Sequence, residues 1–99
     1  MDEQPAPDTS ATISRTVTVS NQRGLHARAA AKFVKLAACY DAQVTVQRNG
    51  MAVGGESIMG LMMLAASPGT SITLSASGPD ADAAILALEE LVIRKFDED

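Results

Sequence analysis

The stretch of the chain that decides the fold is residues 43–53, which read QVTVQRNGMAV. Polar and apolar residues alternate in its first half, as they do in a strand with one buried face. Asn49-Gly50 then supplies two neighbouring residues that tolerate positive φ, which a tight type I′ turn requires. The pattern therefore predicts an antiparallel hairpin with strands at 43–48 and 51–53.

Two more strands are expected, one on each side of this hairpin along the chain. Residues 12–20 and 71–77 both alternate with period 2, with apolar residues on one face and mainly serine and threonine on the other. The inward-facing residues are Ile13, Val17, Val19, Ile72, Leu74 and Ala76.

Helical patterns separate the strands. Residues 27–38 are rich in alanine and contain no proline or glycine, so their helix propensity is high. Residues 57–64 predict a two-turn helix, and a last helix begins with Asp80 or its neighbour as the cap and carries an apolar stripe toward Phe96. In the first helix we expect a buried stripe and an outward basic face: Ala30, Phe33, Val34 and Ala37 inward; Arg28, Lys32 and Lys35 outward.

The resulting order, βαββαβα, predicts an α+β fold. A helix joins the first two strands, so they run parallel, and the fourth strand fits between them, antiparallel to both. This gives an open-faced β-sandwich: a four-stranded antiparallel sheet of order 1-4-2-3, covered on one face by three helices. We expect one domain at residues 12–96, a disordered extension at 1–11 and an acidic tail at 97–99.

Composition excludes several classes of protein. Ninety-nine residues with 46% hydrophobic content suit a single domain, and a net charge of −4 argues against nucleic-acid binding. Cys39 is alone, which favours a reducing compartment. No apolar run approaches the roughly 20 residues that span a bilayer, and residues 1–7 lack the apolar core of a signal peptide. We therefore expect a cytoplasmic protein without membrane insertion.

The only histidine, His26, lies in the stretch 24–30, GLHARAA, between a strand and a helix. The first turn of a helix has unpaired N–H groups and the positive end of the helix dipole, so it stabilises phosphate. If the helix begins at Ala27, the amides of Ala27 and Arg28 point toward the ring, and Arg28 can pair with phosphate oxygens. The same spacing also fits a plain helix cap or a solvated surface residue.

Two motifs together carry a family resemblance. Residues 24–30 and residues 56–62, ESIMGLM, resemble HPr, the histidine-containing phosphocarrier of the bacterial phosphoenolpyruvate-dependent phosphotransferase system. The resemblance runs from about Thr12 to Phe96 and includes the order of the elements. The family fold is the open-faced β-sandwich expected above.

The resemblance implies a role for each residue of the first motif. His26 accepts a phosphoryl group through Nδ1 from enzyme I and passes it to an enzyme IIA component, while Arg28 balances the phosphate charge. The protein would be a monomeric carrier and not an enzyme, with no cofactor or metal. The family usually has proline where this chain has Ala29. Proline there only pre-sets φ, so we expect the transfer role to survive.

Ser57 matches the regulatory serine that HPr kinase/phosphorylase modifies in many bacteria. A helix N-terminus suits an added phosphate, although the neighbouring Glu56 would repel it somewhat. Serine at this position is also an ordinary N-cap, and both interpretations stand.

Residues 58–64 contain six large apolar side chains, more than one face of a short helix can bury. We expect Leu61 and Leu64 in the core, and a surface patch near His26 of Ile58, Met59 and Met62. The alternative is that all six are buried. The resemblance implies that enzyme I and the acceptors dock on this patch, with Lys35 as a basic docking residue; Ala38 stands where the family often has another lysine.

Three functions remain to be distinguished. The first is a phosphocarrier that serves sugar uptake, regulation or both. The second is a nitrogen-type regulatory carrier. The third is an interaction module that keeps the fold without phosphotransfer, which the presence of His26 and Arg28 disfavours.

Overall fold

The computed structural model describes residues 12–98. The expected extension at 1–11 and Asp99 lie outside the described residues. Along the chain the elements are β1 (Ile13–Thr18), α1 (Ala27–Ala37), β2 (Gln43–Arg48), β3 (Met51–Gly54), α2 (Ile58–Met63), β4 (Ser71–Ser77), α3 (Ala81–Ile93) and the short 3-10 helix η2 (Lys95–Asp97). This is the βαββαβα order that the alternation of polar and apolar residues predicts, with η2 added.

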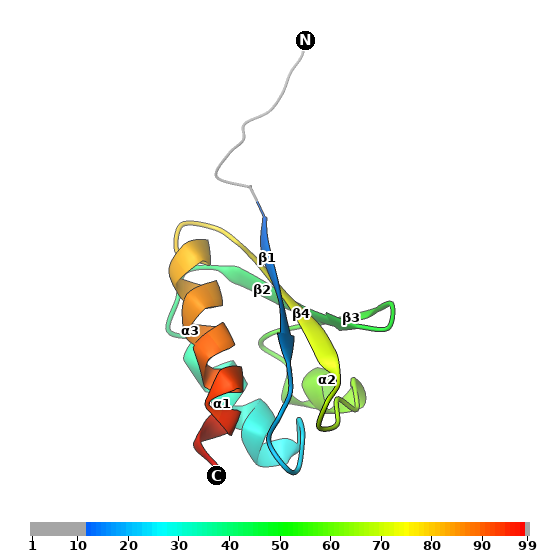
Figure 1. Ribbon diagram of the computed structural model, residues 1–99. Coiled ribbons are helices and arrows are strands. Elements are labelled where there is room, and N and C mark those ends of the chain that lie inside the picture. The colour runs from blue at the N-terminus through cyan, green and yellow to red at the C-terminus, as the bar shows by residue number, and fades with distance from the viewer. Residues whose placement is uncertain (1–11, 99) are drawn as a thin grey trace.

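The four strands form one sheet of order β1-β4-β2-β3, and each neighbouring pair is antiparallel (Figure 1). β4 lies between β1 and β2, pairing Ile72 with Val17 and Leu74 with Val46. The predicted strand order is therefore confirmed. At the hairpin, Asn49 has φ 50° and Gly50 has φ 82°, as the type I′ turn requires.

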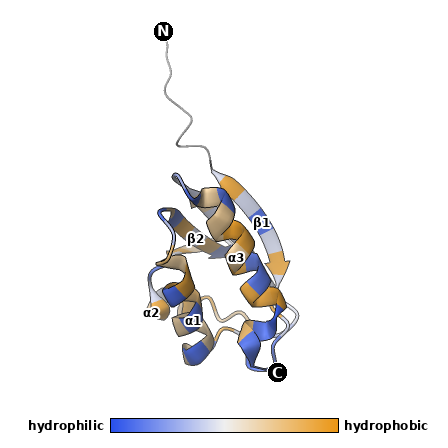
Figure 2. Ribbon diagram, turned by 90° about the vertical axis from the view of Figure 1, so that its left-hand side faces the viewer, coloured by the Kyte–Doolittle hydropathy of each residue, from blue (hydrophilic) through white to orange (hydrophobic). Residues whose placement is uncertain are grey.

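The helices form a second layer on one face of the sheet. Figure 2 shows α3 in front of β2, with β1 beside α3 and α1 below it. α3 packs on β1 and β4, and α2 packs between α1 and β3. The largest fully buried apolar side chains come from both layers: Phe33, Phe96, Leu61, Ile72, Leu74, Ile85, Leu88, Val19, Val46 and Val92. This core fixes the start of α1 relative to the sheet and to α2.

Several boundaries and side chains differ from the expectations. β1 is shorter at both ends, α1 ends at Ala37, and α2 leaves Ser57 and Leu64 as its caps. Asp80 is the N-cap residue of α3, but its carboxylate accepts from the backbone N–H of Asp41 instead of capping the helix.

Three expectations about side chains need correction. Lys32 does not face fully outward: it is partly buried and its Nζ donates to the carbonyl oxygen of Phe96 at 2.7 Å. Val34 is only partly buried, whereas Ala29 is fully buried. Phe96 is buried as expected, but it lies beyond α3 in η2, because the chain reverses its helical sense there.

Candidate functional site

The loop that carries His26 is fixed by its own backbone. Gly24 has φ +65°, and a Cβ at this position would lie 2.3 Å from the carbonyl oxygen of Ala66. The N–H of Leu25 donates to that same oxygen at 2.9 Å, and the Leu25 side chain is buried. The segment after α2 therefore holds the loop, and the absence of a side chain at Gly24 permits the close approach.

His26 occupies the N-cap position of α1 with an extended backbone, φ −78° and ψ −179°. Its carbonyl oxygen accepts the first helical hydrogen bond, from Ala30 at 2.8 Å, but its side chain does not cap the helix. Within residues 12–98, the amides of Ala27, Arg28 and Ala29 have no acceptor. Ala29 adds a donor here that proline would lack. The result is a group of unpaired amides directly after His26 in the chain, at the positive end of the helix dipole.

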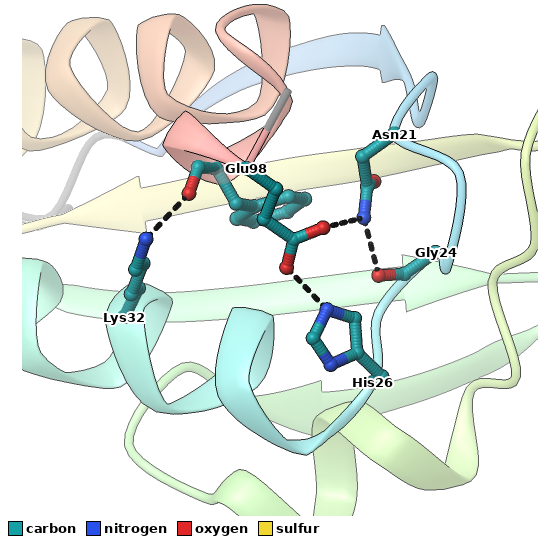
Figure 3. A network of polar contacts seen from close by, with 6 residues as sticks. Asn21, Gly24, His26, Lys32 and Glu98 are labelled. Atoms are coloured by element: carbon teal, nitrogen blue, oxygen red, sulfur yellow. Dashed lines mark hydrogen bonds and ion pairs between the residues drawn. The ribbon is translucent and has the colours of Figure 1, made fainter.

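The imidazole of His26 contacts a carboxylate from the other end of the chain. Its Nε2 hydrogen-bonds to Oε2 of Glu98, and the two side chains are only 20% and 13% exposed (Figure 3). The buried Asn21 joins this pair, since its Nδ2 donates to Glu98 Oε1 at 3.1 Å and to the carbonyl oxygen of Gly24 at 2.8 Å. The histidine ring is therefore held and not freely rotating.

Positive charge gathers next to this pair. Arg28 is exposed and lines a polar pocket of about 260 Å³ together with Arg23 and Lys32. Glu98 and Asp97 line the same pocket, so it adjoins the histidine. Three cationic side chains near a helix N-terminus favour an anion such as phosphate. A larger cavity of about 580 Å³ lies at the other end of α1, around Tyr40 and Gly78, and contains none of the predicted site residues.

Ser57 is the N-cap of α2, and its Oγ accepts from the N–H of Gly60 at 2.9 Å. The capping interpretation is thus realised in the structure. The side chain remains partly exposed.

α2 divides its apolar residues as the sequence predicts. Leu61 and Leu64 are buried, while Ile58 and Met62 are each 39% exposed and Met59 is 70% exposed. Met63 is exposed as well. The interpretation that all six large residues are buried is therefore wrong. Lys35 is exposed on α1, which packs against α2.

Sequence reasoning missed Glu98 and Asn21. Glu98 was assigned to an acidic tail, and Asn21 to a loop that ends the first strand. Glu98 is 72 residues from His26, and Asn21 reaches His26 only through its bond to Glu98, so no periodicity reveals either residue. A signal was available in Phe96: an apolar residue beyond the helix anchors the acidic residues that follow it.

In the part of the chain that is described, no helix has the length and apolar character to cross a bilayer.

A single histidine at the start of a helix, next to unpaired amides and cationic side chains, suits a protein that carries phosphoryl groups. Comparison with known proteins agrees. The family model described as "PTS HPr component phosphorylation site" matches residues 13–94.

Individual relatives extend this match. The chain is 52% identical over 83 residues to phosphocarrier protein HPr of Pseudomonas aeruginosa, covering 83% of the chain and 92% of that protein. It is 45% identical over 86 residues to phosphocarrier protein NPr of Shewanella violacea, covering 87% and 94%. The crystal structure of HPr-C-His from Thermoanaerobacter tengcongensis matches with a TM-score of 0.84 and 41% identity, covering 88% and 98%. The chain belongs to the HPr family, whose members are phosphocarriers of the phosphotransferase system and not enzymes.

Proposed function

We propose that His26 is the phosphoryl acceptor of this phosphocarrier, and that it takes the group through Nδ1 from phospho-enzyme I and passes it to an enzyme IIA component. One observation carries the proposal: His26 is the N-cap residue of α1, and the three amides that follow it have no acceptor within residues 12–98. A phosphoryl group on the ring would find these donors already oriented.

The transfer needs no cofactor. The Nδ1 lone pair of His26 forms a bond to phosphorus while the bond from phosphorus to the donor histidine breaks, and its electrons return to the donor ring. The return step has the same form, with a histidine or cysteine of the acceptor as the nucleophile. Because imidazole is both nucleophile and leaving group, transfer is accessible in both directions, as a carrier requires.

Arg28 and the amide of Ala27 are the residues that we assign to the phosphate itself. Arg28 is exposed and lines the polar pocket that Glu98 also lines, so we assign its guanidinium to a bidentate pair with phosphate oxygens. The amide of Ala27 is the first free donor after the ring. Together they offset the negative charge that the histidine gains.

Docking of both partners is assigned to Ile58, Met59, Met62 and Lys35. The three apolar residues are exposed on α2 next to α1, and exposed apolar patches mark contact surfaces. Methionine adapts to different partners, which suits a protein that meets a donor and several acceptors.

Ser57 is proposed as a regulatory phosphorylation site for an HPr kinase/phosphorylase. A phosphate on Oγ would lie at the start of α2, next to the docking residues Ile58 and Met59. Added negative charge there would weaken docking. Incubation with the kinase and ATP, followed by peptide mass spectrometry, tests the assignment, and an unmodified Ser57 would contradict it.

The carrier serves sugar uptake, regulation or both, and a nitrogen-type regulatory branch is a second candidate because a relative named NPr is among the similar proteins. Comparison of phosphoryl transfer to a sugar-specific and to a nitrogen-type enzyme IIA distinguishes the two. We further infer that the protein is a monomer, which a measurement of its size in solution would test. We also infer a cytoplasmic location.

The decisive experiment is incubation of the chain with enzyme I and phosphoenolpyruvate, followed by measurement of intact mass. The wild type should gain one acid-labile phosphoryl group, and His26→Ala should gain none. Because His26 is the only histidine, no second ring can substitute for it. An unchanged adduct on His26→Ala would move the site elsewhere, and no adduct on the wild type would favour an interaction module.

A further inference from the structure

Glu98, in the last turn that the structure describes, holds the ring nitrogen that the proposed transfer does not use. Its Oε2 accepts from Nε2 of His26, and its Oε1 accepts from the amide of Asn21 at 3.1 Å. Figure 3 shows the carboxylate between these two side chains. Asn21 is fully buried, so the far side of the carboxylate is fixed by a rigid donor.

The backbone takes an unusual course to bring Glu98 there. Lys95, Phe96 and Asp97 have φ values of 61°, 55° and 60°, three successive non-glycine residues in the left-handed region. Such residues are disfavoured and persist where their surroundings fix them, often at functional sites.

Three contacts fix this turn. The Phe96 ring is fully buried, and Nζ of Lys32 donates to the Phe96 carbonyl oxygen at 2.7 Å. Nε of Arg94 donates to Oδ1 of Asp97 at 2.9 Å, closing the turn from the solvent side. These contacts hold the turn of residues 95–97 in one conformation, and this conformation places Glu98 next to His26.

The carboxylate is in its ionised form at neutral pH. Burial raises the pKa of Glu98, but hydrogen bonds from Asn21 and His26, with the charges of His26 and Lys32, outweigh it and bring the pKa below its ordinary value. An ionised carboxylate can only accept hydrogen bonds, so Nε2 of His26 carries the hydrogen. In the neutral ring, Nδ1 is then the nitrogen with the free lone pair.

We propose that Glu98 is a positioning residue for phosphoryl transfer: it fixes the hydrogen on Nε2, orients Nδ1, and supports the charge that the ring gains. This inference rests on the proposed function of His26. As Nδ1 bonds to phosphorus and the donor bond breaks, Nε2 keeps its proton and the ring becomes cationic. The carboxylate stabilises that cation, as a carboxylate does for other histidines that react through one nitrogen.

Two readouts test the proposal on the full chain. The first is NMR of the protein labelled with ¹⁵N-histidine, which reports a single ring. The wild type should show a protected ring N–H proton on Nε2, and Glu98→Ala should lose it. Glu98→Gln should retain it, since the amide oxygen can still accept. An absent ring N–H signal in the wild type, or one on Nδ1, would overturn the proposal without any phosphoryl transfer being measured.

The second readout is the single-turnover rate of transfer from phospho-enzyme I. Glu98→Ala should slow transfer about 10-fold, the lower end of the loss seen when the hydrogen-bond partner of a metal-ligating histidine is removed. Glu98→Gln should be slowed less, because it keeps the hydrogen bond and loses only the charge. Glu90→Gln, an exposed charge change on α3, is the matched control and should transfer at the wild-type rate.

The outcomes separate this inference from the function on which it rests. If wild type and Glu98→Ala transfer at equal rates while His26→Ala is inactive, the positioning role is wrong and the carrier function stands. If the wild type accepts no phosphoryl group, both the positioning role of Glu98 and the carrier function of His26 are wrong. A thermal melt of each variant checks folding, and recovery of rate in Glu98→Gln relative to Glu98→Ala excludes a general loss of structure.

Discussion

Gly24 is the residue on which the position of His26 most depends. Its φ of +65° is strained for any other residue, and an added Cβ would lie 2.3 Å from the backbone oxygen that also holds Leu25. Backbone atoms cannot move aside as a flexible side chain can. We therefore predict that Gly24→Ala destabilises the protein by roughly 2–4 kcal/mol and slows phosphorylation of His26.

The control for this substitution is Gly50→Ala. Gly50 has φ +82° but nothing within 4 Å of an added Cβ, so only the backbone cost of about 1 kcal/mol applies. Chemical denaturation measures both variants. Equal losses of unfolding free energy in the two would show that the contact with Ala66 does not constrain the loop.

Single residues also show where prediction from sequence ends. His26 and Arg28 can be proposed as site residues from the sequence, because a histidine at the start of a helix lies where phosphate is stabilised and because the two residues belong to a family motif. Glu98 was not found, because its contact depends on three left-handed residues that no local propensity favours. Lys32 was placed outward by helical periodicity, which takes no account of the η2 carbonyl oxygen that it reaches.

At the scale of elements, α2 was predictable in both its burial and its exposure. Six residues form less than two turns, so only part of an almost wholly apolar segment can face the core. Leu61 takes that position, and Met59 is left 70% exposed. An exposed methionine adds little to stability, so a substitution at Met59 tests the proposed role in binding separately from any effect on folding.

We predict that Met59→Gln weakens binding to enzyme I by about 10-fold, because a contact residue near the centre of an interface contributes on the order of 1–2 kcal/mol. The unfolding free energy should change by less than about 0.5 kcal/mol. Isothermal titration calorimetry with enzyme I measures the first, and denaturation the second.

Met51→Gln is the matched control, since Met51 is exposed on β3 rather than on α2. It should bind enzyme I as the wild type does. If both variants bind normally, the α2 patch is not the docking surface.

At the scale of the whole molecule, alternation and helix periodicity were sufficient for the topology. Each strand has one apolar face, and a fourth strand antiparallel to both β1 and β2 fits between them, which is the order that the sheet has. Alternation and helix periodicity do not predict the contact between the start of α1 and the turn that follows α3. His26 and Glu98 are 72 residues apart, and what joins them is a turn beyond α3 that departs from helical geometry.

Acid should open this junction between the two ends of the fold. The folded structure lowers the pKa of Glu98 from its ordinary value of 4.5, so the folded state favours the ionised carboxylate. The stabilisation is therefore fully present above that ordinary value and is lost as the pH falls through the lowered pKa. The pKa of Asp97 is also lowered, from its ordinary value of 3.8, because Arg94 hydrogen-bonds to it, so the contribution of this pair to η2 is lost only below that value.

We predict that, as the pH falls below 4.5, the amide signals of Gly24, His26 and Glu98 shift together while those of the β2–β3 hairpin do not. The physical reason is local: protonated Glu98 no longer attracts the histidine, and the Asn21 bridge loses its ionised acceptor. ¹H–¹⁵N NMR across an acid titration follows each group separately. In Glu98→Gln the coupled shift should be absent, because no carboxylate remains to titrate. A coupled shift that survives in this variant would assign the transition to another group and remove Glu98 from the junction.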